Sequence, residues 1–138
     1  DRMVLAGIHM ILRTDRSIAV VGDACTVAQA MELTTRLHPK MVLLELTFPE
    51  YEVLTFIADV QKSGQNPVVL ILCDLRTSAL ASKAVLAGAA AIVLTVQPPS
   101  VFLATVRSMA CANAPITPQQ ADPAYLTTAH CGGTVRQI

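Results

Sequence analysis

The chain has 138 residues, of which 53% are apolar and only 14% charged, so most of it is able to fold around a core and is not disordered. Ten basic and ten acidic residues cancel to a formal net charge of +0 at pH 7, which excludes the basic surface that nucleic-acid binding requires. We therefore expect one globular domain that does not itself bind DNA, with a neutral surface suited to association.

The first part of the chain predicts an amphipathic helix, a short strand and a second helix. Apolar residues recur at helical spacing from Arg2 to Arg13, and a β-branched run that ends at a glycine follows from Ile18 to Gly22. Thr26 is a suitable N-cap for the next helix, which continues to the His38-Pro39 dipeptide. This order is typical of an α/β domain.

The segment from Lys40 to Pro49 predicts the central strand of the domain. Five of the six residues from Met41 to Leu46 are apolar without alternation, which is typical of a parallel strand covered by helices on both faces. Glu45 is the exception, and it lies just before the loop that begins at Thr47. Because open α/β folds place their chemistry at the carboxyl ends of the strands, we expect the functional site at that edge.

The alternation continues through the second part of the chain. The predicted helices and strands are, in order, a helix at 53–63, a strand at 68–73, a helix from Thr77 or Ser78 to Leu86, a strand at 90–94 and a helix at 101–111. The pattern predicts a doubly wound parallel sheet with right-handed crossovers. From Asn113 the composition changes to Pro, Thr, Gln and Gly, so we interpret 1–112 as the domain and 113–138 as a linker or tail.

The cysteines give no sign of a disulfide framework or a zinc site. Cys25, Cys73, Cys111 and Cys131 are far apart and form no CxxC pair, so we expect reduced thiols. The three histidines also lack metal spacing, and we expect no metal and no cofactor. No stretch reaches the length of a membrane span and the start lacks the layout of a signal peptide, so we expect a cytoplasmic protein that does not contact a membrane.

Three stretches of the sequence resemble the receiver domains of two-component response regulators, nearest to the NarL/FixJ type. They are the run from Ile18 to Ala24 with its following helix, the Leu-Leu-acid-Leu-x-x-Pro pattern around Glu45, and Ala87-Gly88-Ala89 followed by an apolar strand. The resemblance covers Asp1 to about Pro118 and implies the flavodoxin/CheY-like receiver fold. The helix from Arg2 then matches the family's first helix, so the first strand is absent from this segment.

The resemblance also implies that the phosphorylation machinery is degenerate. A working receiver uses an Asp on the central strand, an acidic pair that holds magnesium, a Thr or Ser on the fourth strand and a Lys on the fifth, because phosphoryl transfer needs a nucleophile, a divalent ion and fixed donors. Here Glu45 stands at the Asp position, Cys73 at the Thr/Ser position and Thr95 at the Lys position, while Ile92 replaces the switch aromatic. We therefore expect no catalytic residue, no metal site and no enzyme activity.

An alternative alignment treats Met3 to Ala6 as the first strand and places Gly7-Ile8 at the acidic pair. It leaves almost no first helix, and it does not restore a magnesium site either. Two further alternatives concern single residues. Glu45 is either a fixed mimic of the phosphorylated state or a strand-end acid without a role, and Cys73 is either a redox-sensitive thiol or a small buried hydrophobe.

The last two predicted helices are unusually poor in charge. Residues 77–89 and 100–111 contain only Lys83 and Arg107 as charged residues, whereas the resemblance implies a dimer face here that is normally rich in charge. Two helices with almost no charge have more apolar residues than are needed to cover the sheet with their inner faces. We therefore expect an apolar patch on their outer side that forms an interface. The residues expected on this dimer face are Leu80, Ala84, Val101 and Arg107.

These observations lead to one functional hypothesis and one alternative. The hypothesis is a phosphorylation-independent pseudo-receiver of an atypical transcriptional response regulator, which acts through constitutive homodimerisation and reaches DNA only through an output domain absent from this chain. The alternative is a small-molecule sensor in which the vacated pocket around Glu45, Cys73 and Thr95 binds a ligand.

Overall fold

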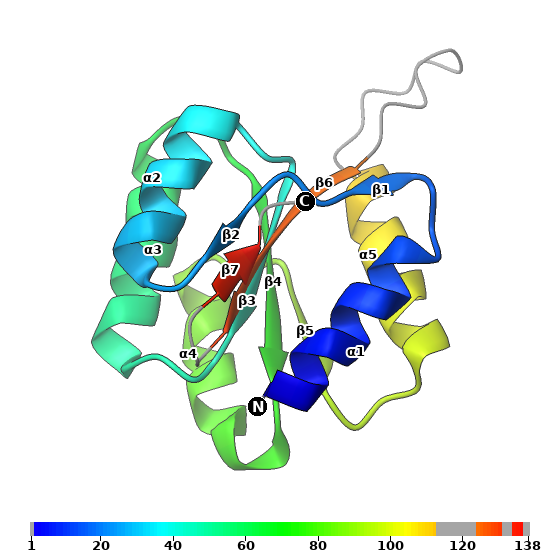
Figure 1. The fold of residues 1–138 in the computed structure, drawn as a ribbon. Coiled ribbons are helices and arrows are strands. Elements are labelled where there is room, and N and C mark those ends of the chain that lie inside the picture. Colours follow the sequence, from blue (N-terminus) through cyan, green and yellow to red (C-terminus); the bar gives the residue numbers. More distant parts are fainter. Residues whose placement is uncertain (1, 113–123, 131–133, 137–138) are drawn as a thin grey trace.

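The structure of the chain is a computed structural model, and it describes residues 2–112, 124–130 and 134–136. Helices and strands alternate along most of the described chain (Figure 1). The helices are α1 (Arg2–Arg13), α2 (Val27–Leu37), α3 (Glu50–Lys62), the short 3-10 helix η1 (Leu75–Thr77), α4 (Ser78–Ala87) and α5 (Pro99–Ala112). The strands are β1 (Ile18–Ala19), β2 (Asp23–Ala24), β3 (Met41–Glu45), β4 (Val68–Cys73), β5 (Ala91–Leu94), β6 (Ala124–His130) and β7 (Thr134–Arg136).

The sheet separates two layers of helices, as Figure 1 shows. Its strand order is β1-β6-β3-β4-β5, with β2 and β7 each paired to β6. On one face, residues of α2, α3 and α4 pack against the sheet around Phe56 and Ile57, and on the other face α1 and α5 pack around Leu12 and Val106. This arrangement confirms the predicted α/β fold with a parallel sheet flanked by helices, of the flavodoxin/CheY-like kind.

The central strand predicted from Met41 is confirmed. Every residue of β3 is buried, and β3 pairs in parallel with β4, with Met41 opposite Val68 and Glu45 opposite Leu72. Consecutive side chains of a strand point to opposite faces, so an unbroken apolar run supplies both cores at once. The strand therefore joins the two helical layers and carries Glu45 to the carboxyl edge of the sheet.

The first helix and the cap of the second helix are also as predicted. Residues 2–13 form α1, so the alternative in which Met3 to Ala6 form a strand is wrong. The hydroxyl oxygen of Thr26 accepts a hydrogen bond from the backbone N–H of Gln29 at 3.1 Å, which caps α2 at its N-terminus. At the other end His38 adopts a left-handed conformation before Pro39, and α2 ends there.

The single strand predicted from Ile18 to Gly22 is instead divided into β1 and β2. Both pair in parallel with β6, with Ala19 opposite Tyr125 and Asp23 opposite Thr128. Three residues separate Ala19 from Asp23, whereas two separate their partners on β6, so this side carries one extra residue. An extra residue interrupts strand pairing in the manner of a β-bulge, and the apolar pattern of the sequence does not reveal it.

The segment interpreted as a linker or tail contributes two strands to the sheet. β6 lies between β1 and β3, with Met41 opposite Leu126 and Leu43 opposite Thr128, and β7 pairs with β6 in antiparallel fashion. The sequence interpretation missed both strands, because a Pro- and Thr-rich composition is typical of loops while strand formation depends on the neighbours that a segment pairs with. The boundary between a domain at 1–112 and a separate segment at 113–138 stays a prediction.

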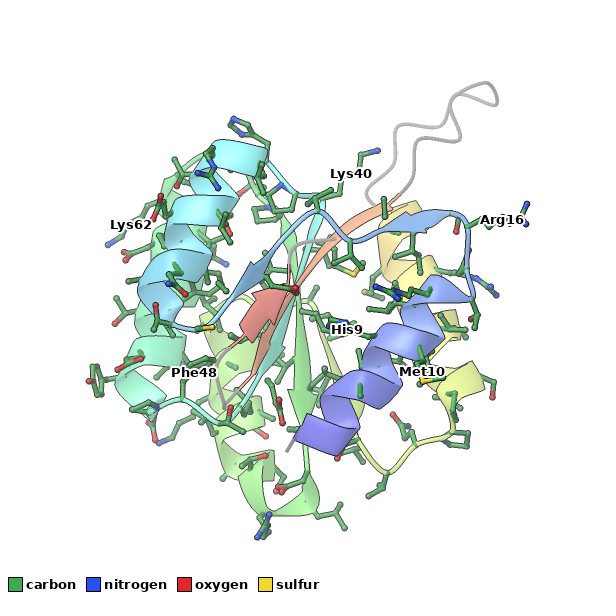
Figure 2. All side chains as sticks on the ribbon, viewed as in Figure 1. His9, Met10, Arg16, Lys40, Phe48 and Lys62 are labelled. Carbon is green, nitrogen blue, oxygen red and sulfur yellow. The ribbon has the colours of Figure 1, made fainter. Side chains whose placement is uncertain are left out.

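The outer faces of the helices carry the polar and scattered apolar side chains. Met10 projects from α1 and Lys62 from α3, away from the sheet on opposite sides of the molecule (Figure 2). Among the residues that the structure describes, no helix has both the length and the apolar content needed to cross a membrane.

Candidate functional site

The carboxyl ends of three neighbouring strands bring the predicted site residues together. Glu45 is the last residue of β3, Cys73 is the last residue of β4, and Thr95 follows β5 directly. The pairing continues past the ends of the strands, since the backbone N–H of Thr95 donates to the carbonyl oxygen of Cys73 at 2.9 Å. The backbone N–H of Leu46 donates to the carbonyl oxygen of Leu72 at 3.0 Å. The strand ends therefore fix the relative positions of all three residues.

These three residues line one cavity of about 520 Å³. The rest of the lining comes from the loops after β3 and β4 and consists of Leu46, Thr47, Leu72, Asp74, Arg76 and Thr77. A volume of this size lies within the range of small-molecule sites in proteins. Glu45, Cys73 and Thr95 thus lie around the same cavity at the carboxyl edge of the sheet.

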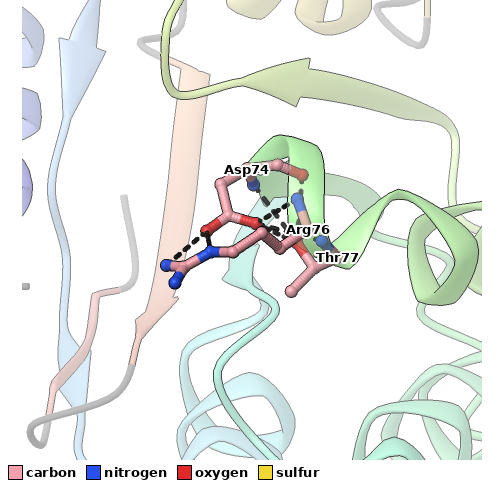
Figure 3. A network of polar contacts seen from close by, with 3 residues as sticks. All are labelled: Asp74, Arg76 and Thr77. Atoms are coloured by element: carbon pink, nitrogen blue, oxygen red, sulfur yellow. Dashed lines mark hydrogen bonds and ion pairs between the residues drawn. The ribbon is translucent and has the colours of Figure 1, made fainter.

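The rim of the cavity is held by a polar network that the sequence interpretation did not include. Figure 3 shows Asp74, which accepts hydrogen bonds from the backbone N–H groups of Arg76 at 2.8 Å and Thr77 at 3.0 Å. The Thr77 hydroxyl in turn accepts from the backbone N–H of Asp74 at 3.2 Å, which completes a capping box at the start of η1. The signal was present in the sequence as an Asp followed three residues later by a Thr.

The one basic side chain among the described lining residues belongs to Arg76. Its guanidinium forms an ion pair with Asp74, with Nη2 to Oδ2 at 3.0 Å, and the side chain is 91% exposed. These contacts lower the pKa of Asp74, first through the Arg76 side chain. Since exposed ion pairs of this kind stabilise little, we assign Arg76 to the rim and not to a buried anion site.

Burial disfavours the ionised form of two groups that line the cavity, Glu45 and Cys73. Burial raises the pKa of the Glu45 carboxyl, and the nearby Asp74 raises it further. Burial also raises the pKa of the Cys73 thiol, again with a contribution from Asp74. Both shifts act against the functional alternatives, since imitation of a phosphoryl group needs the charged carboxylate of Glu45 and nucleophilic reactivity needs the thiolate of Cys73.

The structure does not bring Ile92 into this cavity. Ile92 lies in the middle of β5, which is the edge strand of the sheet beyond β4, and its side chain is partly exposed there. Its backbone is opposite Ile71, and not at the strand ends where Glu45 and Thr95 lie. Ile92 therefore belongs to the outer surface of the sheet edge.

The residues expected on the dimer face divide into two groups. Val101 is exposed near the start of α5, as expected. Ala84 is 0% exposed and packs into the core under α4, and Leu80 is partly buried against the same core, so the expectation of an outer position is wrong for Ala84. The large exposed apolar residues of α4 are instead Val85 and Leu86, of which Leu86 is 89% exposed.

Large exposed apolar side chains lie on η1, α4, β5, the loop after β5 and the start of α5, and we call this set of residues the α4–α5 face. It consists of Leu75, Val85, Leu86, Ile92, Val96 and Val101. The charged residues of the two helices are engaged within the chain. Lys83 Nζ lies 2.6 Å from Glu50 Oε1 on α3, and Arg107 Nε lies 2.6 Å from Asp15 Oδ2 after α1.

This site is distinct from the larger groove of the molecule, and the described residues give it no cluster of metal ligands. Among the described residues no group of three His, Cys, Asp or Glu side chains is placed to hold a metal ion. A larger groove of about 950 Å³ lies between α2 and α3, around Met31, Tyr51 and Phe56, and contains none of the predicted site residues. The cavity at the strand ends is therefore smaller, but it is the one that contains the predicted site.

Comparisons with known proteins agree with a receiver-like domain at low identity. The chain is 35% identical over 92 residues to protein-glutamate methylesterase/protein-glutamine glutaminase 2 of Cereibacter sphaeroides, which is 66% of this chain and 25% of that protein. It is 29% identical over 63 residues to protein-glutamate methylesterase/protein-glutamine glutaminase 1 of Methanosarcina acetivorans, or 46% of this chain and 18% of that protein. No family model matches the chain.

The matches thus span about a quarter or less of the length of these relatives. They support a receiver domain in general, and they do not distinguish the NarL/FixJ type from others. The activity in the relatives' names belongs to those whole proteins, and it is not transferred to this chain.

Proposed function

We propose that this chain is a receiver-like domain of a NarL/FixJ-type transcriptional regulator and that it works without phosphorylation. In this proposal it acts by constitutive self-association and is not itself an enzyme. One observation carries the proposal. The cavity at the carboxyl edge of the sheet contains Glu45, Cys73 and Thr95 where the receiver resemblance implies an Asp, a Thr or Ser, and a Lys. DNA would then be reached through an output domain outside this chain.

The chemistry of these three residues argues against phosphoryl transfer. A receiver needs an ionised carboxylate as nucleophile and a cation that neutralises the incoming phosphate. Burial raises the pKa of Glu45, so its ionised form is disfavoured. Thr95 supplies no positive charge, and Arg76 is paired with Asp74 at the rim. A domain with such a cavity has no phosphate-driven switch, and its association state is set by packing alone.

The α4–α5 face supports association as the remaining activity. It exposes Leu86 and five further large apolar side chains, and the charges of α4 and α5 nearest to it are paired with Glu50 and Asp15 of the same chain. Burial of such surface against a second copy contributes about 25 cal/mol per Å² of apolar area. Since the net charge is zero, electrostatic repulsion between copies is small.

The experiment that tests the proposal is a measurement of oligomeric state with charged variants. Leu86→Glu and Val101→Glu place carboxylates on the α4–α5 face, and we expect the double variant to be monomeric by light scattering at tens of micromolar, the order at which weak dimers form. Leu37→Glu is the matched control, since Leu37 is 39% exposed and Val101 38%, but Leu37 lies on α2. The control should remain a dimer.

Two results would overturn the proposal. One is a monomeric parent chain under the same conditions, which would remove self-association as the activity. The other is equal dissociation by Leu37→Glu and by the double variant, because the α4–α5 face would then not be the interface. Circular dichroism of each variant shows whether the fold is retained.

A second candidate function is supported by the volume of the cavity. Its 520 Å³ can hold a small molecule, and burial raises the pKa values of Glu45 and Cys73, which disfavours negative charge inside it. A neutral carboxyl donates and accepts hydrogen bonds, so the site suits a ligand of mixed polarity better than an anion. In this alternative the ligand replaces phosphate as the input signal.

A further inference from the structure

We propose that β6 is an exchangeable strand, so that two copies of this chain form a dimer in which each inserts Ala124–His130 into the sheet of the other. The proposal goes beyond association through the α4–α5 face, since it uses a different part of the molecule. It starts from the position of β6, which is the sixth strand along the chain but lies inside the sheet, between β1 and β3 (Figure 1).

The slot that β6 occupies has backbone partners on both sides. On one side Ile18 and Asp23 are opposite Ala124 and Thr128, and on the other side Leu43 is opposite Thr128. Without an occupant, the facing edges of β1 and β3 would leave backbone N–H and C=O groups unpaired inside the domain, which is costly. The slot therefore requires a parallel strand, but the pairing does not require that the strand come from the same chain.

Chain order adds an argument about folding. Residues 2–112 supply both helical layers and the strands on either side of the slot, and β6 follows all of them in the sequence. The last strand must therefore enter between elements that precede it, and until it does so the slot is open to any copy. Pairing between distant segments is slow to form, which prolongs this open stage.

The connection between α5 and β6 allows either route. Residues 113–123 include Pro115, Pro118 and Pro123, and prolines stiffen a connection by fixing φ. From Ala112 to Ala124 the chain spans at most roughly 40 Å when extended, which is enough to reach a neighbouring copy. An exchanged dimer has the same strand pairing as a monomer. The equilibrium between the two therefore depends on strain in the linker and on the protein concentration.

The test is disulfide trapping between two variants of the full chain, each with one introduced cysteine. One variant carries Asp23→Cys and the other carries Thr128→Cys, because Asp23 and Thr128 are paired in register on β2 and β6. Both are made in a background with Cys25→Ser, Cys111→Ser and Cys131→Ser, while the buried Cys73 is retained. The two chains carry tags of different mass, are unfolded and refolded together at tens of micromolar, and are then oxidised.

We expect a disulfide-linked heterodimer on a non-reducing gel, at least about tenfold above the control, because only paired positions lie within disulfide reach. The control pairs Asp23→Cys with Thr127→Cys, because position 127 is one residue out of register with Asp23. Refolding at lower concentration should reduce the heterodimer. The Leu86→Glu/Val101→Glu background should leave it unchanged, which separates this interface from the α4–α5 face.

A double variant that carries Asp23→Cys and Thr128→Cys in one chain shows whether β6 pairs with β2 of its own chain. If the double variant forms only an internal disulfide and the mixture of single variants forms no heterodimer, each chain keeps its own β6 and the proposal is overturned. If neither experiment gives a disulfide, β6 does not occupy the slot in the observed register, and the proposal is overturned as well.

Discussion

Asp15 and Arg107 join the two helices on one face of the sheet across 92 residues of sequence. Arg107 Nε on α5 donates to Asp15 Oδ2 at 2.6 Å, and the Asp15 side chain is almost fully buried after the end of α1. The other carboxylate oxygen, Oδ1, accepts from the backbone N–H and the hydroxyl of Ser17. A buried carboxylate with three donors contributes to stability only while it is ionised.

The first prediction follows from the pKa of Asp15, which is lowered from its usual 3.8 to about 2 by the Ser17 hydrogen bonds and then by Arg107. Because the folded-state pKa is below the unfolded one, this contribution is fully present above about pH 4 and is lost as the pH falls toward 2. Asp15→Asn should lower the free energy of unfolding by about 1 to 2 kcal/mol at pH 7. Most of the difference from the parent chain should be lost at pH 2, as measured by urea unfolding.

Arg76→Ala is the control for this prediction. It removes the ion pair with Asp74, which is exposed to solvent, and its effect on the free energy of unfolding at pH 7 should be smaller than that of Asp15→Asn. If Asp15→Asn lowers the free energy of unfolding by the same amount at pH 2 as at pH 7, the stabilisation does not come from the charge of Asp15.

The second prediction concerns Gly88, which ends α4 at a φ of 127° that side chains rarely adopt. A Cβ at this position would also lie 1.6 Å from Gln61 Nε2 of α3. Gly88→Ala should therefore lower the free energy of unfolding by about 1 to 3 kcal/mol. Gly7→Ala is the control, since Gly7 lies within α1 with no neighbouring atom within 4 Å of the added Cβ, and it should stabilise by about 0.5 to 1 kcal/mol.

A second substitution separates the two causes at Gly88. If backbone strain dominates, Gln61→Ala will not restore the stability of Gly88→Ala, since it removes only the clash. Full recovery in the double variant would show that the close approach of Gln61 was the main cost. Thermal unfolding of the four chains gives the answer.

The order of elements from Arg2 to Ala112 could be predicted because each carries its own periodic pattern. β4 and the first four residues of β3 are unbroken apolar runs, and α2 has a side-chain cap at Thr26, so local sequence decides their type. β6 could not be predicted in this way. Its residues alternate little and follow a Pro-rich stretch, and it is a strand because β1 and β3 leave a slot for it.

The site was predictable to the extent that topology decides it. Parallel strands end at one edge of a sheet, so Glu45, Cys73 and Thr95 converge whatever their neighbours are. The outer face of α4 was not predictable, because most positions of that helix are apolar and a periodic pattern does not then select a face. Ala84 consequently proved to be core, and Leu86 proved to be surface.

The third prediction is that acetyl phosphate and magnesium do not phosphorylate this domain. Burial disfavours the ionised form of Glu45, and the described cavity supplies neither a metal cluster nor an unpaired cation to hold a phosphoryl group. Mass spectrometry of the treated chain should show no acid-labile adduct. A phosphoryl adduct on the parent chain that is absent from Glu45→Gln would contradict the prediction. The domain would then be regulated by phosphorylation of Glu45.

The fourth prediction tests the cavity at the strand ends as a ligand site. A set of small neutral amides and alcohols serves as the probe, and a binder should raise the melting temperature with increasing concentration, because it binds the folded state only. At 100 times its Kd the stabilisation should be about 2.7 kcal/mol. Thr95→Trp fills part of the 520 Å³ cavity and should abolish the shift. Ala28→Trp, which blocks the groove between α2 and α3 instead, is the matched control and should leave it unchanged. A shift that survives Thr95→Trp but disappears in Ala28→Trp would move the ligand to that groove and remove the support for a sensor at Glu45.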